Sequence, residues 1–381
     1  MINIKEKFLQ LTKSRTPKGT EENVIKLIPE FKFEKDEFDN FYYIIKKEDG
    51  TFSNTMFTSH LDTIDRGPFS YSDKKWDTVN RVWIYNDDTV KDNKSITHVI
   101  DGDFIKTDGN TNLGADDKAG VVLMLNLMSE NVPGLYYFFM GEESGCVGSS
   151  NLSRKFEEKV KEGILPKVNK CISFDRRGYD SVITNQSGRD CCSDEFAKEL
   201  SEQLNEYGFW YEPDNSGIYT DSAEFTDVIE ECTNLSVGYF SEHTTSEKQD
   251  IEFLELLGVV LTKIDWENLT IKRDITNIKY TGKKSKTYGS GYDKDWDWDE
   301  YYGHGYGYWG GEYHARNNHD TKTNNTNTNK TPKKDDDSMN KYFDSGSGLV
   351  EIDDTEFDKW YMEQKNKGWT VKDINEDISV D

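Results

Sequence analysis

Five short stretches of the sequence carry side chains that commonly bind divalent metal ions. They are FTSHLDT with His60 and Asp62, LGADDKAG with Asp116 and Asp117, FFMGEESG with Glu142 and Glu143, ISFDRRG with Asp175, and YFSEHTTSE with His243. Zinc accepts imidazole nitrogen and carboxylate oxygen as ligands. Each stretch alone has an ordinary explanation, as a polar turn, a solvated loop or a favourable charge at a helix N-terminus. Five in succession, each where an apolar strand ends or a helix begins, predict a metal-dependent site.

The elements that must position these side chains follow from the alternation of apolar and amphipathic segments. We expect helices at residues 2–12, 20–31 with Thr20 as N-cap, 117–130, 149–163, 193–208 and 250–266. We expect strands at residues 41–47, 55–62, 134–140, 170–175, 181–185 and 234–240. Near-continuous apolar strands between helices predict an α/β domain with a mixed, largely parallel sheet covered by helices on both faces. Such sheets bind ligands at the carboxyl ends of their strands.

Composition divides the chain into three parts. Residues 1–280 carry the regular alternation and form the expected folded body. Residues 281–340 are rich in Gly, Tyr, Trp, Asp and Asn but poor in aliphatic side chains, which predicts a flexible, low-complexity linker. Residues 341–381 form a short acidic C-terminal segment, for which we expect a helix or a docking peptide. The aromatic side chains of this tail also suggest a protein partner.

The charge and the cysteine content exclude several classes of protein. The 381 residues include 72 acidic and 47 basic side chains, a formal net charge of -25, which speaks against binding to nucleic acid or to an anionic membrane. The five cysteines are odd in number and show neither a CxxC pair nor a secreted framework. The N-terminus has no apolar core of a signal peptide, and no stretch approaches the roughly 18 apolar residues of a membrane span. We therefore expect a cytoplasmic protein.

The order of the five stretches resembles the co-catalytic zinc exopeptidases. This superfamily includes peptidase T-like tripeptidases and double-zinc aminopeptidases, and the likeness covers roughly residues 3 to 265. The combination of GADDKAG with GEESG is a specific signal, whereas His-x-Asp alone is not. The resemblance implies that residues 1–280 form a di-zinc hydrolase catalytic domain.

The resemblance also implies a role for each candidate residue. Asp116 would bridge two Zn²⁺ ions, with His60 and Asp175 on one ion and Glu143 and His243 on the other. Glu142 would be the general base, and Asp62 would hydrogen-bond to His60 and fix its tautomer. Two Zn²⁺ ions nearly balance three carboxylates and a bridging hydroxide, which explains why an aspartate pair stands at a helix start. Co²⁺ and Mn²⁺ suit similar ligands.

One departure from peptidase T limits what can be carried over. Those enzymes insert a lid domain between the last aspartate ligand and the final histidine, but only 67 residues separate Asp175 from His243 here. Because those residues are needed for the sheet, we expect no lid, and tripeptide specificity does not follow. Arg176 and Arg177 are candidates for binding a substrate carboxylate, or else they support the fold. Asp221 is a candidate near the substrate amine, or else a helix cap.

The sequence thus predicts a metal-dependent exopeptidase that acts on short peptides, as an aminopeptidase or a tripeptidase-like enzyme. A deacylase, an amidase or a glutaminyl cyclase on the same site is an alternative. A non-catalytic binding descendant is a further alternative, although the complete set of predicted ligands together with Glu142 speaks against it. Residues 68–100, with two tryptophans, are expected to rim the cleft or to form a surface hairpin.

Overall fold

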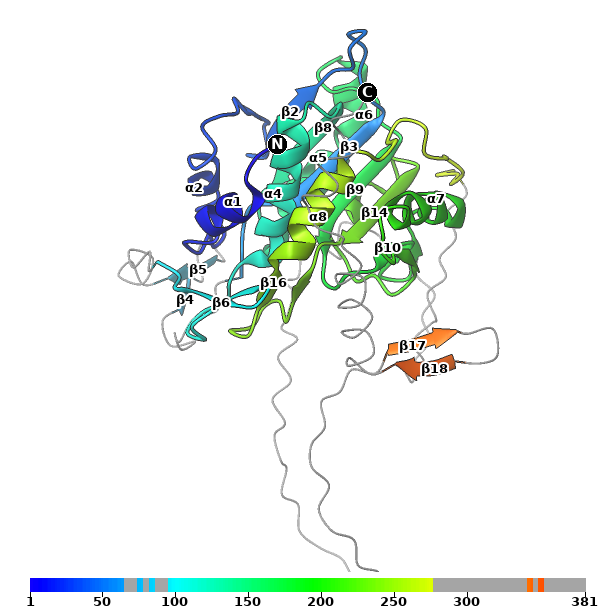
Figure 1. The fold of residues 1–381 in the computed structure, drawn as a ribbon. Coiled ribbons are helices and arrows are strands. Elements are labelled where there is room, and N and C mark those ends of the chain that lie inside the picture. Colours follow the sequence, from blue (N-terminus) through cyan, green and yellow to red (C-terminus); the bar gives the residue numbers. More distant parts are fainter. Residues whose placement is uncertain (65–73, 78–81, 86–94, 277–340, 345–348, 353–381) are drawn as a thin grey trace, which may run out of the picture. The chain divides into compact units, whose positions relative to one another are not determined.

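The structure is a computed structural model that describes residues 1–64, 74–77, 82–85, 95–276, 341–344 and 349–352 (Figure 1). The chain divides into two units, which are treated separately. The second unit contains the antiparallel strands β17 (Lys341–Asp344) and β18 (Leu349–Ile352), so the described part of the 341–381 segment is extended and not helical. The linker expected at residues 281–340 lies outside the described residues.

An eight-stranded mixed sheet forms the centre of the first unit, in the order β1-β2-β8-β3-β9-β14-β10-β13. Its strands are β1 (Glu34–Lys35), β2 (Phe41–Ile45), β3 (Thr55–His60), β8 (Gly134–Phe139), β9 (Lys170–Arg176), β10 (Ser181–Ile183), β13 (Glu212–Asp214) and β14 (Glu231–Ser236). The four central strands β8, β3, β9 and β14 are parallel, whereas β2 joins β8 and β10 joins β14 in antiparallel fashion. The predicted fold class is confirmed.

Helices cover both faces of this sheet. On one face lie α1 (Ile4–Leu11), α4 (Ala115–Ser129), α7 (Asp194–Asn205) and α8 (Ile251–Leu261), which share one apolar cluster. On the other face, α5 (Val147–Ser153), α6 (Phe156–Lys161) and the 3-10 helix η3 (Asp221–Phe225) pack in a second cluster. Helices α4 and α8 lie side by side across the first face (Figure 1).

Strand β8 is apolar throughout. Leu135, Tyr137 and Phe139 belong to one cluster, and Tyr136 and Phe138 belong to the other. Successive side chains of a strand point to opposite faces. Because helices cover both faces, each position of β8 is buried, and an alternating polar pattern would leave polar groups in the core.

Two predicted helices differ from the structure. The segment at 20–31 is helical only in α2 (Glu22–Ile25), because Pro29 disfavours a helical conformation at the residue before it. Thr20 is not its N-cap, since the Thr20 hydroxyl donates to the carbonyl of Pro17 at 2.7 Å. The helix expected at 149–163 is divided into α5 and α6. Within α5, Ser153 donates to the carbonyl of Ser150 at 3.0 Å, a local bond that competes with regular helix geometry.

A second sheet of four antiparallel strands was not predicted. It contains β6 (His98–Asp101), β7 (Phe104–Thr107), β15 (Tyr239–Phe240) and β16 (Lys248–Asp250), in the order β15-β16-β7-β6. The loop between β15 and β16 carries His243, and β16 leads directly into α8. This sheet therefore fixes both ends of the loop that carries the last candidate ligand. Strands β4 (Lys74–Asp77) and β5 (Val82–Tyr85) form a separate pair, and most of the expected rim at 68–100 lies outside the described residues.

Two further properties of the described residues concern the helices and the cysteines. In the part of the chain that the structure describes, no helix is long and apolar enough to cross a membrane. All five cysteines lie in this part, and each is buried with a free thiol.

Lys170 is a buried cation at the opposite end of β9 from Asp175, and it gives a test of this packing. Its ammonium donates to the carbonyl of Glu267 at 3.0 Å, and burial lowers its pKa to about 8 from the ordinary 10.5. Between these values the unfolded chain binds more protons than the folded one, so the free energy of unfolding should rise with pH from about 8 to 10.5.

Urea denaturation at several pH values should show that this rise is smaller in Lys170→Met than in the wild type. The control Lys198→Met replaces a lysine on α7 whose side chain is 70% exposed, and it should keep the rise. An identical pH dependence in wild type and Lys170→Met would contradict the prediction.

Candidate metal centre

The candidate ligands converge at the carboxyl ends of the parallel strands. His60 is the last residue of β3, and Asp175 lies one residue before the end of β9. Glu143 follows β8 in the 3-10 helix η2 (Glu142–Ser144), and Asp116 lies at the start of α4. Strand ends, a helix start and the β15–β16 loop therefore bring side chains from five distant stretches together.

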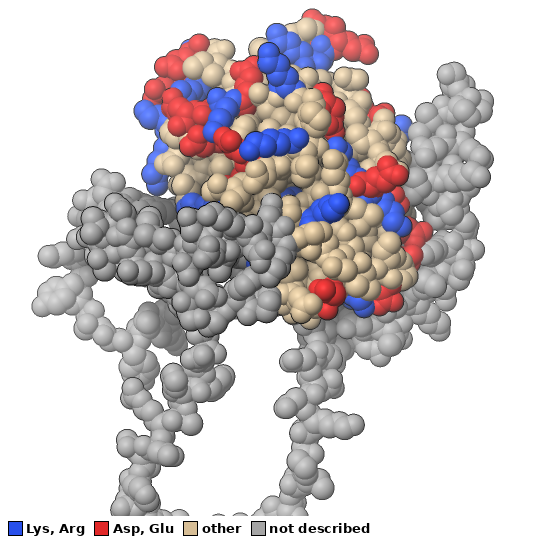
Figure 2. Space-filling model, turned by 90° about the vertical axis from the view of Figure 1, so that its left-hand side faces the viewer, with Lys and Arg blue, Asp and Glu red and all other residues tan. Residues whose placement is uncertain are grey.

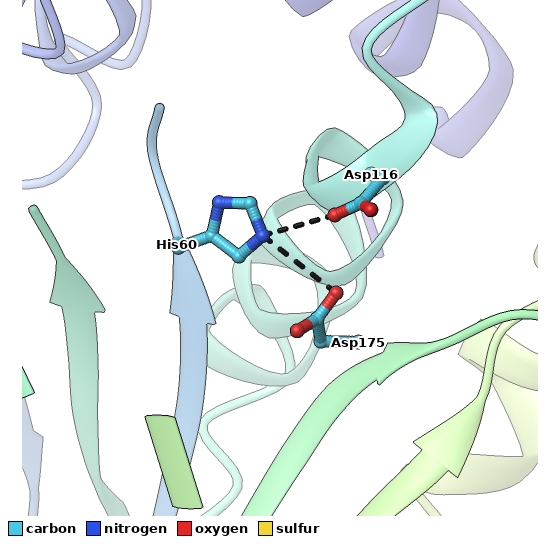
Figure 3. Close-up of side chains that lie close together, drawn as sticks. All are labelled: His60, Asp116 and Asp175. Carbon is cyan, nitrogen blue, oxygen red and sulfur yellow. Dashed lines mark hydrogen bonds and ion pairs between the residues drawn. The ribbon is translucent and has the colours of Figure 1, made fainter. Parts of the chain in front are cut away.

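The side chains form two groups that share Asp116. In the first, His60 Nε2 lies 3.0 Å from Asp116 Oδ1 and 3.6 Å from Asp175 Oδ1 (Figure 3). In the second, His243 Nε2 lies 3.1 Å from Asp116 Oδ2 and 3.1 Å from Glu143 Oε1. The two oxygens of one carboxylate thus face two different histidines.

This donor set fits two divalent cations. Within each group, one ligand atom per residue lies within 4.8 Å of the others. One imidazole nitrogen and two carboxylate oxygens per group are donors that zinc accepts, with room for a further ligand. A carboxylate common to both groups is what a pair of cations about 3.5–4 Å apart requires. The five residues that would hold the ions are those predicted, namely His60, Asp116, Glu143, Asp175 and His243.

The crowded carboxylates shift the pKa of both histidines upward. Burial alone would lower the pKa of His243, but hydrogen bonds with Asp116 and Glu143 outweigh it and raise the value to about 11. Burial is likewise outweighed at His60, where the charge of Asp175 and a hydrogen bond with Asp116 raise the pKa well above 6.5. Protons and metal ions therefore compete for the same ring nitrogens, and metal binding should release protons.

Asp62 supports the site in a different way from the one expected. The nearest contact of His60 Nδ1 is the main-chain oxygen of Asp62 at 2.9 Å, and the Asp62 carboxylate is farther away at 3.5 Å. That carboxylate accepts the main-chain N–H groups of Glu142 at 3.0 Å and of Glu143 at 3.2 Å. Asp62 therefore contacts His60 chiefly through its main-chain oxygen, and its carboxylate fixes the turn that carries Glu142 and Glu143.

Asp117 is directed away from the two groups and holds the scaffold together. Its carboxylate accepts the hydroxyl of Ser59 and the N–H groups of His60 and Gly120, the last two at 3.1 Å. A Cβ on Gly120 would lie 2.4 Å from the carbonyl oxygen of Phe174, so only glycine allows α4 to pack this closely on β9. Asp116 thus faces the two histidines, whereas the adjacent Asp117 holds the surrounding backbone in place.

Glu247 is a residue of the site that the sequence analysis did not single out. Its side chain is 1% exposed, and its carboxylate accepts the N–H groups of Leu113 at 2.8 Å, Gly114 at 2.8 Å and Asp116 at 3.0 Å. It therefore fixes the backbone from which the shared carboxylate of Asp116 projects. The only signal in the sequence was its position four residues after His243.

Lys118 was also missed as a supporting residue. It is 1% exposed, and its ammonium donates to the carbonyl of Leu61, between His60 and Asp62. Burial lowers its pKa to about 8, while Asp62 and Asp117 favour the charged form. Lys118 thus adds positive charge beneath the carboxylates.

Glu142 lies beside the two groups but outside them. Its Oε2 is 3.9 Å from His60 Nε2, and its Oε1 accepts the thiol of Cys146 at 3.5 Å. Burial raises the pKa of Glu142 well above 4.5, although the charge of His60 opposes the shift. A carboxylate with a raised pKa near a metal site is suited to accept a proton from water.

The candidate substrate contacts have different surroundings. Arg176 and Arg177 line a cleft together with the site residues Asp116, Glu142, Asp175 and His243. Arg176 donates to Asp214 at 3.4 Å and to Ser216 at 3.1 Å, and Arg177 donates to Glu242 at 3.1 Å. Both arginines therefore already have partners.

Asp221 is buried behind the cleft and is not among the described residues that line it. Its carboxylate accepts the hydroxyl of Ser149 and makes no hydrogen bond that caps a helix, and burial raises its pKa to about 8. The neighbouring Thr220 donates its hydroxyl to Asp175. The structure thus places Asp221 near the site without giving it access to the cleft.

Comparison with known proteins gives the fold. No protein-family model matches the chain. A stretch of 74 residues is 42% identical to the uncharacterized protein YqjE of Bacillus subtilis (strain 168), and it spans 18% of this chain and only 20% of that protein. The structure is similar to aminopeptidase PepT from Bacillus cereus ATCC 10987, with a TM-score of 0.52 and 16% identity over 69% of this chain and 97% of that chain.

A dodecameric structure of PhTET1-12s is similar as well, with a TM-score of 0.50 and 15% identity over 69% of this chain and 98% of that chain. At these identities the likeness concerns the fold. The chain has the fold of these peptidases, as the resemblance in its sequence implied.

The role of Glu247 can be tested by replacing it with glutamine. A glutamine side chain has a single acceptor oxygen, so at least one of the three N–H groups would face an amide NH₂ group. We expect Glu247→Gln to weaken zinc binding about 10- to 100-fold, measured by competition with a chelating dye. The control Glu202→Gln replaces a glutamate that is 65% exposed, and it should leave the affinity unchanged. Equal affinities in the two variants would rule out a positioning role.

Metal removal should also destabilise the protein. Free zinc at 100 times its Kd contributes about 2.7 kcal/mol of stability, which raises the Tm of a domain of this size by about 5 °C. Chelation followed by dialysis should lower Tm by this amount, and added zinc should restore it. In His243→Ala, metal removal and added zinc should change Tm by less than in the wild type. A Tm that does not change after verified metal removal would argue against a metal-filled site.

Proposed function

We propose that this chain is a metal-dependent exopeptidase that hydrolyses peptide bonds of short peptides, as an aminopeptidase or a tripeptidase-like enzyme. The observation that carries the proposal is the pair of ligand groups that share Asp116, with Glu142 beside them in an open cleft. The fold shared with aminopeptidase PepT supports it. Zinc is the proposed metal, and Co²⁺ or Mn²⁺ would suit the same donors.

In the proposed reaction Glu142 moves the proton. The two cations, when bound, would supply Lewis acidity toward water and toward the scissile carbonyl. Glu142 accepts a proton from the attacking water and passes it to the leaving amine. The thiol of Cys146 donates to one oxygen of this carboxylate, so the other oxygen remains available on the side of His60. Asp62 holds the backbone of Glu142, which fixes where its side chain begins.

A second candidate function is hydrolysis of a different amide, by a deacylase or an amidase on the same site. The cleft also contains Arg176 and Arg177, and a guanidinium group suits a substrate carboxylate. Their pairing with Asp214 and Glu242 makes this use less favourable than a supporting role. A non-catalytic descendant is disfavoured because the chain keeps every proposed ligand together with a carboxylate, Glu142, beside them in the cleft.

The remaining parts of the proposal concern the organisation of the chain. Residues 1–280 would form the catalytic unit, since they contain every proposed ligand. The aromatic segment at 281–340 would contact a protein partner. The free, buried cysteines agree with a reducing compartment, and the cytoplasm is the proposed location.

The proposal is tested by Glu142→Gln in a metal-loaded protein. Glutamine keeps the size of the side chain but cannot accept the proton, so kcat should fall by about 10²- to 10⁴-fold. Metal content, measured by mass spectrometry, should stay at the wild-type value, because Glu142 belongs to neither ligand group. Activity should be measured on free, N-blocked and C-amidated peptides, which separates an aminopeptidase from a deacylase.

The control Glu157→Gln replaces a glutamate that is 62% exposed on α6, and it should keep full activity. An unchanged rate in Glu142→Gln would remove this residue from the mechanism. A metal-loaded wild type that cleaves no peptide of the panel would overturn the proposed function.

A further inference from the structure

One part of the cleft wall is apolar. Ile218 is 67% exposed and Tyr219 is 45% exposed, and both line the cleft that contains Asp116 and Asp175. Ile183, which is buried, lines the same cleft. Single exposed apolar side chains are ordinary on a protein surface. Adjacent ones within a ligand cleft, next to a metal centre, are typical of a binding pocket.

Backbone contacts hold this wall in place before any ligand arrives. The N–H group of Ser187 donates to the carbonyl of Gly217 at 3.2 Å, and the Ser187 hydroxyl donates to the carbonyl of Ile218. A Cβ on Gly217 would lie 2.4 Å from the carbonyl oxygen of Asn185, so glycine is required for this close approach. The Tyr219 hydroxyl donates to Glu224 at 2.8 Å, which fixes the ring. The apolar surface is therefore preorganised.

The arginines of the cleft already have acidic partners. Arg176 is paired with Asp214, and Arg177 is paired with Glu242. An apolar substrate side chain would leave both pairs in place. Gln186 also lines the cleft and is 3% exposed. Its Nε2 donates to the hydroxyl of Ser222 at 3.1 Å, which fixes the amide, and its Oε1 is buried without a hydrogen-bond partner among the described residues.

We propose that Ile218 and Tyr219, together with Ile183, form a subsite that receives an aliphatic or aromatic side chain next to the scissile bond. The inference rests on the proposed function, because it places a peptide in the same cleft. It names the substrate class, which is short peptides with a large apolar residue at one of the two positions that flank the cleaved bond.

The experiment compares wild type, Ile218→Ala and the control Ile164→Ala. Ile164 is 48% exposed but does not line the cleft. The substrates are Xaa-Gly-Gly and Gly-Xaa-Gly with Leu, Phe, Ala, Asp or Lys as Xaa. For zinc-loaded protein we expect kcat/KM to be about 10- to 200-fold higher for Leu and Phe than for Ala in one series. In Ile218→Ala, kcat/KM should fall about 10-fold for the Leu and Phe peptides and stay unchanged for the Ala peptides. Ile164→Ala should have the wild-type kcat/KM for every peptide.

A second readout separates this inference from the proposed function. Binding of the same peptides to zinc-loaded Glu142→Gln, with and without Ile218→Ala, is measured by calorimetry. A preference for Leu and Phe that depends on Ile218 supports the subsite, even if wild type cleaves nothing and the proposed function fails. Cleavage without that preference, or an equal loss on all peptides in Ile218→Ala, overturns the subsite while the peptidase stands. If no peptide of the panel is bound or cleaved, both the subsite and the proposed function are overturned.

Discussion

The concentration of carboxylates in one buried place is the constraint that organises this structure. A carboxylate removed from water is costly unless hydrogen bonds or cations compensate it. Six acids of this site divide into two groups by how they are compensated. Asp62, Asp117 and Glu247 accept main-chain N–H groups, two, two and three respectively. The others, Asp116, Glu143 and Asp175, face histidines, and these acids are the ones that two cations would neutralise. The first group fixes the backbone on which the second group stands.

Much of the fold could be predicted because the central strands and the long helices carry clear patterns. Strand β8 is a continuous apolar run, and β3 and β9 carry apolar side chains among polar ones. Helices α4 and α7 lie close to their expected bounds, whereas α8 ends at Leu261, before the expected residue 266. The directions of the outer strands could not be predicted, since β2 and β10 are antiparallel to their neighbours for reasons of tertiary packing and not of local sequence. The second sheet was missed because β15 and β16 have only two and three residues, and β16 pairs with the distant β7.

The candidate site followed from the sequence where the residue type itself suggested metal binding. Histidines and paired acids at strand ends point to ligands, and the structure brings together all five that were predicted. The contacts that support the ligands were harder to predict from the sequence. Glu247 binds N–H groups that lie 131 to 134 positions earlier in the chain, and no local pattern marks such a contact. The two bonds from Asp62 to the η2 backbone depend equally on how β3 and β8 pair.

The segment between Asp175 and His243 has two tasks at once, and this explains why the cleft and the ligand groups are linked. It supplies strands β10, β13 and β14 to the main sheet, and its loop with Gly217, Ile218 and Tyr219 forms the apolar wall. Thr220 follows that wall directly, and its hydroxyl donates to Asp175. A displacement of the wall would therefore pull on a proposed ligand. One short loop both shapes the wall and anchors the proposed ligand. A substitution in this loop that changes the substrate preference should therefore also change the geometry of Asp175.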